Sequence, residues 1–411
     1  MASRPKTALV LAGGAARGAY EAGVISYLYD GLERETGAKP QFDIFCGTSV
    51  GAINACFLAA NAHRPADQGR LLADRWSSLE LEDVLKIDVS DVGRFLRTLV
   101  GVGGRASPSR RSGLVDPSRL ETLVLDTAPW SYIQKNLEDK RFDSLAVSAT
   151  HVATGRTEVF VQRADGTVPP WSRDARVRAV SARIRPQHAL ASAAIPLLFP
   201  AVKIDGQYYC DGGLRQNTPL SPALRLGADR VLVIALRHEP RTVRESSDRI
   251  SLLSPEREEA FPSPFFLLGK VLNALLLDHL DYDLQRLERY NALIEGGVAA
   301  FGGAFEERLN EVLSKYRGQT VRRVQPMLIR PSRDLGELAA HYARTEAFAR
   351  RARGLAGTIV RRLADVETPD EADLVSYLLF DGGYCKMLVE LGIADARALR
   401  TQLAEFFSHA A

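Results

Sequence analysis

Two short apolar runs, each followed by a glycine-rich turn and a helical pattern, lie near the start of the chain. The first is Thr7–Leu11 (TALVL), after whose glycines a helical pattern covers Ala19–Leu28. The second is Phe42–Cys46 (FDIFC), and here the helical pattern covers Ala52–Ala62. Consecutive strand–turn–helix units build a parallel sheet covered by helices, because parallel strands must be joined by a crossover. The feature predicts the α/β fold class, with a mostly parallel central sheet.

The rest of the chain adds strands and then a largely helical second half. We expect strands at Ser144–Thr150, Glu158–Gln162, Val202–Ile204, Tyr208–Cys210, Arg230–Leu236 and Gln325–Ile329. We expect helices at Ala189–Ala194, Phe265–Ile294, Leu335–Leu363, Glu371–Leu391 and Ala396–Phe407. Arg237–Glu259 is charged and loop-like, which is typical of an insertion.

Composition excludes several classes of protein. The 411 residues are 46% hydrophobic and 25% charged, so the chain is not broadly disordered. Its 53 basic and 50 acidic residues leave a net charge of only +3, so we expect no nucleic-acid partner. The four cysteines form no C-x-x-C pair, which argues against a disulfide scaffold and favours a reducing compartment: Cys46, Cys56, Cys210 and Cys385. We expect no metal and no cofactor.

No apolar stretch has the length and flanks of a membrane span or a signal peptide. The N-terminal run ends in glycines rather than in a cleavage site. The run Phe265–Leu277 contains Lys270 and Asn273 and is shorter than the roughly 20 residues that a span requires. We therefore expect a cytoplasmic protein whose contact with a membrane, if any, is peripheral.

The first candidate site is the loop Gly13-Gly14-Ala15-Ala16-Arg17-Gly18, between a strand and a helix. Glycines there let backbone N–H groups face an open space, and the start of the helix adds positive potential. Such a loop suits a phosphate or a developing oxyanion. Ala15 breaks the G-x-G-x-x-G spacing, and no G-K-[ST] ending is present, so nucleotide binding fits poorly.

The second candidate site is Gly47-Thr48-Ser49-Val50-Gly51, also between a strand and a helix. A G-x-S-x-G sequence in that context is typical of a nucleophile elbow, in which a strained turn presents the serine hydroxyl. The flanking Gly47 and Gly51 let strand and helix approach closely. We interpret Ser49 as a candidate nucleophile.

The third candidate site is Asp211-Gly212-Gly213, which follows a strand-like run. An Asp at the end of a strand can direct its carboxylate out of the sheet. A second copy, Asp381-Gly382-Gly383, lies between helical patterns and is interpreted as a turn between helices. None of the seven histidines lies in a catalytic motif, although position leaves His188 and His238 open as partners of Ser49.

Together, GGAARG, GTSVGA and ASAAIPLLFPAVKIDGQYYCDGG resemble the patatin-like phospholipase family of serine lipid acyl hydrolases. The resemblance covers roughly the first 225 residues, with Ser49 and Asp211 separated by 162 positions. It implies a three-layer α/β/α sandwich and a Ser–Asp dyad. It also implies hydrolysis of a phospholipid or other acyl-ester lipid.

The resemblance implies a role for each matching residue. Ser49 is the expected nucleophile and Asp211 its general base, which must be buried because a carboxylate is otherwise too weak a base for serine. The expected oxyanion hole is the backbone of Gly13, Gly14 and Ala15, and Ala15 stands where the family often has Gly. Arg17 is expected to fix the shape of this loop. Gly18, Gly47, Gly51, Gly212 and Gly213 are expected to support the turns.

The domain organisation expected from these patterns has three parts. Residues 7–225 form a patatin-like core, residues 226–333 add core strands with a helical insertion at about 237–322, and residues 334–411 form a helical C-terminal region. Two stretches are candidates for lipid contact. For the basic loop over Gly93–Gly113, binding to anionic headgroups and simple solvation stay equally open, and for the run Phe265–Leu277 helical spacing favours core or dimer packing. Homo-oligomer formation stays open.

Three other functions stay open beside a lipid acyl ester hydrolase. An acyltransferase or thioesterase would use the same dyad. A regulated effector lipase would be gated by its insertion or its C-terminus. A binding module with a relic site is disfavoured because Ser49 and Asp211 are both present.

Overall fold

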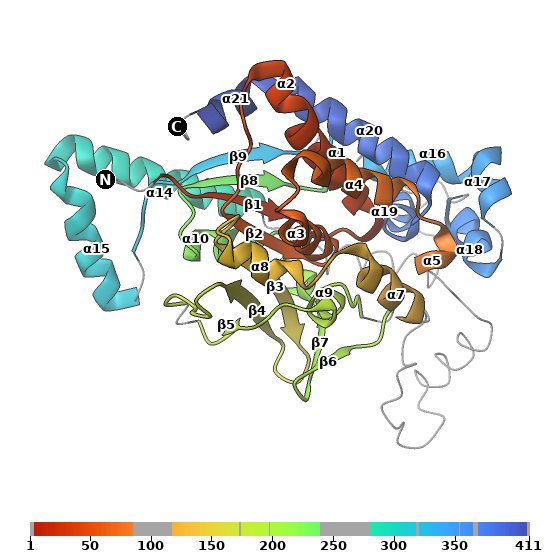
Figure 1. Ribbon diagram of the computed structural model, residues 1–411, viewed down its shortest axis with the longest axis horizontal. Coiled ribbons are helices and arrows are strands. Elements are labelled where there is room, and N and C mark those ends of the chain that lie inside the picture. The colour runs from red at the N-terminus through yellow and green to blue at the C-terminus, as the bar shows by residue number, and fades with distance from the viewer. Residues whose placement is uncertain are drawn as a thin grey trace, which may run out of the picture.

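The computed structural model describes residues 4–84, 117–171, 174–196, 198–238, 280–317, 320–352, 354–364 and 369–408. Its centre is a twisted sheet with the strand order β5-β4-β3-β2-β1-β8-β9, to which β7 and β6 are added beside β3 (Figure 1). The strands are β1 (Thr7–Leu11), β2 (Ile44–Thr48), β3 (Ser144–His151), β4 (Arg156–Arg163), β5 (Val177–Ser181), β6 (Val202–Ile204), β7 (Gln207–Asp211), β8 (Arg230–Ile234) and β9 (Gln325–Ile329).

The middle of the sheet is parallel, and the region around β3 and β7 is not. β1 pairs in parallel with β2 and β8, β2 with β3, and β8 with β9. β3 runs antiparallel to β4 and to β7, and β6 runs antiparallel to β7. The mostly parallel sheet expected from the sequence is confirmed, with this antiparallel part as an addition.

Two apolar cores lie on the two faces of the sheet. Along β1, Leu9 and Leu11 belong to one core, whereas Ala8 and Val10 belong to the other. This alternation follows from the strand period of two, and both faces are apolar because helices cover both. The architecture is therefore the three-layer α/β/α sandwich.

Each face has its own helices. The larger core contains α1 (Gly18–Ser26), α3 (Val50–Asn61), α4 (Pro65–Ser77) and α20 (Gly382–Ala398), and the smaller one contains α10 (Leu220–Arg225) and α14 (Leu280–Phe301). The other helices are α2 (Glu33–Thr36), α5 (Leu81–Val84), α7 (Pro117–Thr127), α8 (Tyr132–Glu138), α9 (Pro186–Ser192), α15 (Ala304–Arg317), α16 (Leu335–Ala343), α17 (Glu346–Arg351), α18 (Leu355–Ala364), α19 (Pro369–Leu378) and α21 (Arg400–Ser408).

The sequence patterns located most strands but misjudged the C-terminal helices. β1, β6 and β9 have the expected bounds, whereas β5 was not expected because its burial pattern mixes half-buried and exposed residues. The expected helix Leu335–Leu363 is wrong as a single helix: the Thr345 side chain caps α17, and Gly354, with a φ of 102°, precedes α18. Likewise Asp381 caps α20 and separates it from α19.

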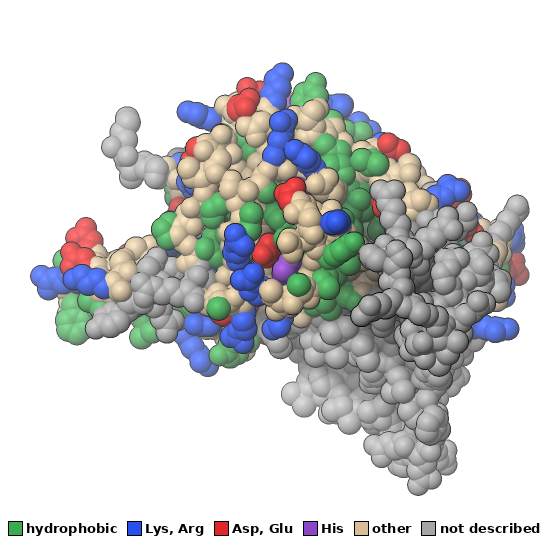
Figure 2. Space-filling view, turned by 90° about the horizontal axis from the view of Figure 1, so that it is seen from below, with side chains coloured by type: hydrophobic (Ala, Val, Ile, Leu, Met, Phe, Trp, Pro, Cys, Tyr) green, Lys and Arg blue, Asp and Glu red, His purple; other side chains and the backbone are tan. Residues whose placement is uncertain are grey.

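Helices α14 and α15 form a hairpin that protrudes from the body of the molecule (Figure 1). Large hydrophobic side chains are exposed on it, and Figure 2 shows green side chains on this projecting part beside charged ones. They are Tyr282, Tyr290, Leu293, Phe301 and Val312.

Among the described residues, no helix combines the length and the apolar character that crossing a membrane would need. Several expectations lie outside the described residues. These are the whole of the basic loop over residues 93–113, the apolar run 265–277, and all of the charged stretch 237–259 except its first two residues.

Candidate active site

Ser49 lies at the turn between β2 and α3, in a backbone conformation that few non-glycine residues adopt. Its φ is 54° and its ψ is −127°, and the side chain is 2% exposed. The turn is tight on both sides. A Cβ on Gly47 would lie 2.2 Å from the Gly51 carbonyl oxygen, and a Cβ on Gly51 would lie 2.4 Å from the Leu11 carbonyl oxygen. The two glycines therefore let the strained turn close.

Asp211 is brought to Ser49 by the sheet. It ends β7, which pairs with β3, and β3 pairs with β2, at whose end Ser49 lies. The Ser49 Oγ hydroxyl donates a hydrogen bond of 2.7 Å to Asp211 Oδ2. The other carboxylate oxygen, Oδ1, accepts one of 2.7 Å from the Gly213 N–H. A Cβ on Gly212 would meet the Ser148 carbonyl oxygen at 2.3 Å, so the turn after Asp211 also needs glycine.

The Asp211 carboxyl is in a low-dielectric environment. It is 1% exposed, and burial raises its pKa from 3.8 to about 7, although the hydrogen bonds from Ser49 and Gly213 act in the opposite direction. A serine hydroxyl that donates to a carboxylate with such a pKa is arranged for general-base activation near neutral pH.

The second Asp-Gly-Gly copy has the same local turn but a different environment. Asp381 Oδ1 accepts from the Gly383 N–H at 2.9 Å, which matches the Asp211 turn. Its carboxylate, however, binds the Tyr342 hydroxyl and the Arg351 guanidinium. This copy caps α20, in agreement with its interpretation as a turn between helices.

The glycine loop lies beside Ser49, and its three expected amides are not equivalent. The Gly13 N–H donates to the Asn217 carbonyl oxygen at 3.0 Å, so this amide already has a partner. Within the described part of the chain, the N–H groups of Gly14 and Ala15 have none. Ala15 has a φ of 49°, which costs an alanine about 1 kcal/mol relative to glycine.

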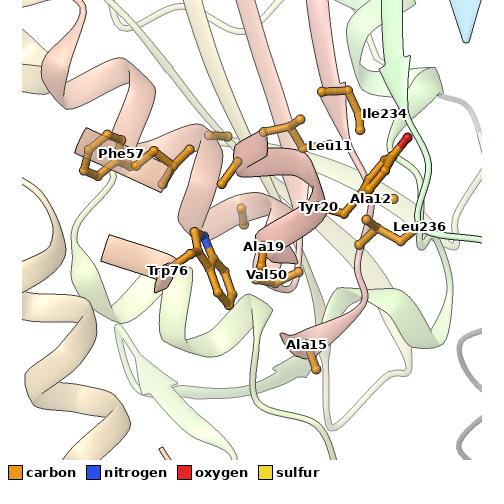
Figure 3. Close-up of a cluster of buried hydrophobic side chains, with 14 of the residues drawn as sticks. Leu11, Ala12, Ala15, Ala19, Tyr20, Val50, Phe57, Trp76, Ile234 and Leu236 are labelled. Carbon is orange, nitrogen blue, oxygen red and sulfur yellow. The ribbon is translucent and has the colours of Figure 1, made fainter. Parts of the chain in front are cut away.

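Figure 3 shows how the loop meets the helices behind it. Ala19, Val50 and Trp76 come from α1, α3 and α4 and lie close together, while Ala15 lies apart from them at the edge of the loop. A Cβ on Gly18 would lie 2.4 Å from Val50 Cγ2, so this glycine lets α1 approach α3. Arg17 is buried, and its side chain binds α19.

Two polar residues hold the turns together and were not singled out from the sequence. The Ser192 hydroxyl accepts from the Ser49 N–H at 2.9 Å and donates to the Ser148 carbonyl oxygen at 2.6 Å. Asn217 also donates from Nδ2 to the Gly13 carbonyl oxygen at 3.1 Å, so it binds Gly13 twice. Both lie in or just after the quoted motifs, but neither has a local pattern that indicates its partner.

An apolar cavity opens beside Ser49. Val50, Ile53 and Ala193 line it near the serine, and its far wall comes from α4, the residue Leu79 just after it, α7 and Phe380: Leu72, Trp76, Leu79, Leu120, Leu123, Val124 and Phe380. Asn54 is a polar residue of this wall, and its amide is already engaged by Glu21 and by the Trp76 indole. The cavity therefore suits a hydrocarbon chain.

The two histidines left open by the sequence have structural partners instead. His188 is buried, its Nδ1 accepts from the Arg185 N–H, and burial lowers its pKa to about 4, so it is neutral. His238 Nδ1 lies 2.9 Å from the Pro331 carbonyl oxygen. In the described ranges, no group of three or more His, Cys, Asp or Glu side chains is arranged to hold a metal ion.

The family model for patatin-like phospholipases matches residues 9–224, which is more than half of the chain. A "cGAMP-activated phospholipase" of Pseudomonas aeruginosa is 28% identical over 211 residues, which cover 51% of this chain and 53% of that protein. The matched segment thus spans about half the length of this relative.

Solved structures show weaker likenesses. VipD from Legionella pneumophila is 13% identical with a TM-score of 0.35, covering 98% of this chain and 67% of that one. Human GIVD cytosolic phospholipase A2 is 12% identical with a TM-score of 0.39, and the match covers 99% of this chain and 59% of that one. At these values neither likeness bears on activity or substrate. The match over residues 9–224, which contains Ser49, Asp211 and the glycine loop, shows that the chain belongs to the patatin-like phospholipase family.

Proposed function

We propose that the protein is a lipid acyl ester hydrolase of the phospholipase A, lysophospholipase or esterase type, with Ser49 as nucleophile and Asp211 as general base. The observation that carries the proposal is the buried 2.7 Å hydrogen bond from Ser49 Oγ to Asp211 Oδ2 beside an apolar cavity. Membership of a phospholipase family supports the lipid substrate.

In the first half of the reaction, Asp211 takes the Ser49 proton as Oγ attacks the ester carbonyl carbon. The carbonyl oxygen becomes an oxyanion, and the N–H groups of Gly14 and Ala15 are its proposed donors. The bond to the leaving alcohol then breaks, and protonated Asp211 returns the proton to that alcohol. An acyl-enzyme on Ser49 remains.

In the second half, a water molecule attacks the acyl-enzyme. Asp211 removes a proton from this water and returns it to Ser49 Oγ as the fatty acid leaves. The raised pKa of Asp211 serves both directions, because a group with a pKa near the working pH can accept and donate a proton.

The experiment that tests this function compares the wild type with Ser49→Ala and Ser192→Ala on a short-chain p-nitrophenyl ester and on a labelled phospholipid. Loss of one oxyanion donor typically costs about 10²–10³ in rate, and loss of the nucleophile costs more, so we expect Ser49→Ala to be inactive. Ser192→Ala keeps the nucleophile but frees the Ser49 N–H, and we expect partial activity. Full activity of a folded Ser49→Ala variant would reject the mechanism.

The cavity predicts a dependence on chain length that one wall residue controls. Leu123→Trp adds a ring to the cavity, and we expect kcat/KM for C12–C16 esters to fall at least about tenfold while a C4 ester is little affected, because each unburied CH₂ costs about 0.8 kcal/mol. Leu125→Trp is the matched control, since Leu125 lies on the same helix but is 54% exposed. Equal profiles for the two variants would place the acyl chain elsewhere.

The relative named a cGAMP-activated phospholipase supports a second proposal, that cGAMP switches this hydrolase on. We expect phospholipid hydrolysis by the wild type to rise when cGAMP is added and Ser49→Ala to stay inactive with it. Equal rates with and without cGAMP, in a preparation that is active on the p-nitrophenyl ester, would reject activation and leave the hydrolase assignment intact.

A further inference from the structure

The side chain of Arg17 crosses from the glycine loop to a helix more than 350 positions away in the sequence. Arg17 Nε donates to the Ser376 hydroxyl at 2.7 Å, and Nη2 donates to Asp373 Oδ1 at 2.7 Å. The guanidinium also lies over the Tyr377 ring, 4.0 Å from its centroid. A weaker bond of 3.4 Å runs from Nη2 to the Asp373 carbonyl oxygen, so the side chain makes three hydrogen bonds and one aromatic contact, all on α19.

The three partners occupy one face of α19. Residues three and four apart lie on the same side of a helix, which is the spacing of Asp373, Ser376 and Tyr377. Burial by itself lowers the pKa of Arg17, but Tyr377 and Asp373 together raise it, so the guanidinium stays charged inside the protein. A buried charge is tolerated only where such partners satisfy it.

Helix α19 is held firmly enough to act as an anchor. A Cβ on Gly336 would lie 2.9 Å from Asp373 Oδ1, so α16 and α19 are in close contact. Helix α20, which follows α19, packs against α1 almost backbone to backbone, because a Cβ on Gly23 would lie 2.1 Å from the Val389 carbonyl oxygen. The loop and its anchor therefore belong to one packed unit.

The backbone of the loop connects Arg17 directly to the candidate oxyanion donors. The Arg17 N–H donates to the Gly14 carbonyl oxygen at 3.0 Å and closes the short 3₁₀ turn of Ala15–Arg17. Ala15 is in the left-handed region, which it leaves unless its surroundings hold it. The direction of the Gly14 and Ala15 amides thus depends on where Arg17 is fixed.

We propose that Asp373, Ser376 and Tyr377 are positioning residues that hold Arg17 and thereby fix the Gly14 and Ala15 amides toward the oxyanion. The inference rests on the proposed hydrolase function, which it deepens by making the C-terminal helices part of the active site. A role of the C-terminal helices in the active site is also supported by Phe380, between α19 and α20. This residue lines the cavity, and its ring stacks on that of Trp76. All four residues lie beyond residue 224, where the family match ends.

The test measures kcat and KM on a p-nitrophenyl ester for Asp373→Asn, Ser376→Ala and their combination. We expect the double variant to lose about 10–100-fold in kcat with KM changed less than about threefold, because oxyanion contacts act only in the transition state. Tyr377→Leu should also lower kcat, whereas Tyr377→Phe keeps the ring over Arg17 and should restore it. In a variant that already carries Arg17→Lys, Asp373→Asn should lower kcat little further, because both substitutions weaken the same Arg17–Asp373 contact.

Asp395→Asn is the matched control. Asp395 also joins the C-terminal helices to the core, through the Tyr20 hydroxyl and the Ser332 N–H, and neither of these hydrogen-bond partners belongs to the glycine loop. We expect it to lower the melting temperature as much as the single α19 variants do while leaving kcat within about twofold. A loss of kcat equal to that of Asp373→Asn would show a general structural effect and overturn the proposal.

Hydrogen exchange of the peptide containing residues 12–19 gives a readout that needs no turnover. We expect faster exchange in this peptide for Ser376→Ala and Asp373→Asn, and unchanged exchange for Asp395→Asn. Unchanged exchange and kcat in the double variant would reject the positioning role while the hydrolase assignment stands. An inactive wild type would reject the hydrolase assignment, and exchange alone would then decide whether α19 holds the loop.

Discussion

Asp211→Asn is expected to abolish ester hydrolysis and, at the same time, to stabilise the fold at pH 8. The lost base should cost about 10³–10⁴ in kcat. The gain in stability has a separate cause: at pH 8 the wild type must keep an ionised carboxylate that is 1% exposed, and an amide of the same shape carries no charge. Asn can still accept from Gly213 through Oδ1.

The sign follows from the pKa of Asp211, which burial raises from 3.8 to about 7 in the folded protein. The stability that protonated Asp211 contributes is fully present below its unfolded pKa and is lost as the pH rises through about 7. Asp211→Asn has no group that ionises here, so its unfolding free energy does not fall as the pH rises. We therefore expect this variant to be more stable than wild type by about 2–4 kcal/mol at pH 8, and by progressively less as the pH falls toward 4.

Thermal or urea midpoints of both proteins across pH 4–8 check the stability, and the rate of ester hydrolysis by the wild type checks the pKa. kcat/KM should rise with pH and level off above about 7, because only ionised Asp211 accepts the Ser49 proton. Asp381→Asn is the control from the second Asp-Gly-Gly copy: it weakens the contacts to Arg351 and Tyr342 and should lower stability without removing activity. A rate that is independent of pH between 5.5 and 8.5 would exclude Asp211 as the base.

Gly47→Ala is expected to have the largest effect on folding among conservative changes at the site. The new Cβ would lie 2.2 Å from the Gly51 carbonyl oxygen and 2.5 Å from the Ala52 nitrogen. Both atoms are backbone at the start of α3, so no side-chain rotation relieves the clash. We expect a loss of about 3 kcal/mol or more of unfolding free energy, together with loss of activity as the Ser49 turn opens.

Gly296→Ala provides the comparison. Gly296 lies within α14, and apart from the neighbouring backbone of that helix no described heavy atom lies within 4 Å of the position that its Cβ would take. Alanine in a helix is favoured over glycine by about 1 kcal/mol, so this variant should be slightly more stable and fully active. If Gly47→Ala unfolds at the same urea concentration as Gly296→Ala, the close approach at the Ser49 turn is not a constraint on the fold.

Features that depend on neighbouring residues could be predicted from the amino-acid sequence alone. Thr7–Leu11 and the motif around Ser49 indicated a parallel sheet with a strand–turn–helix elbow, and the strand before Asp211 distinguished it from Asp381. These inferences succeeded because strand period, glycine turns and helix starts are local properties. The half-exposed strand β5 and the breaks at Thr345 and Gly354 were missed because their local signals are weak beside the surrounding pattern.

Contacts between groups that are distant in the sequence become visible in the three-dimensional fold. It placed Ser192 on the Ser49 N–H, occupied the Gly13 amide with Asn217, and bound Arg17 to Asp373. These partners are separated by 143 to 356 positions, and no local pattern indicates which of many similar side chains will be chosen. The pKa of Asp211 likewise depends on burial by distant segments, because the free energy of a charge is set by what surrounds it in space rather than by its neighbours along the chain.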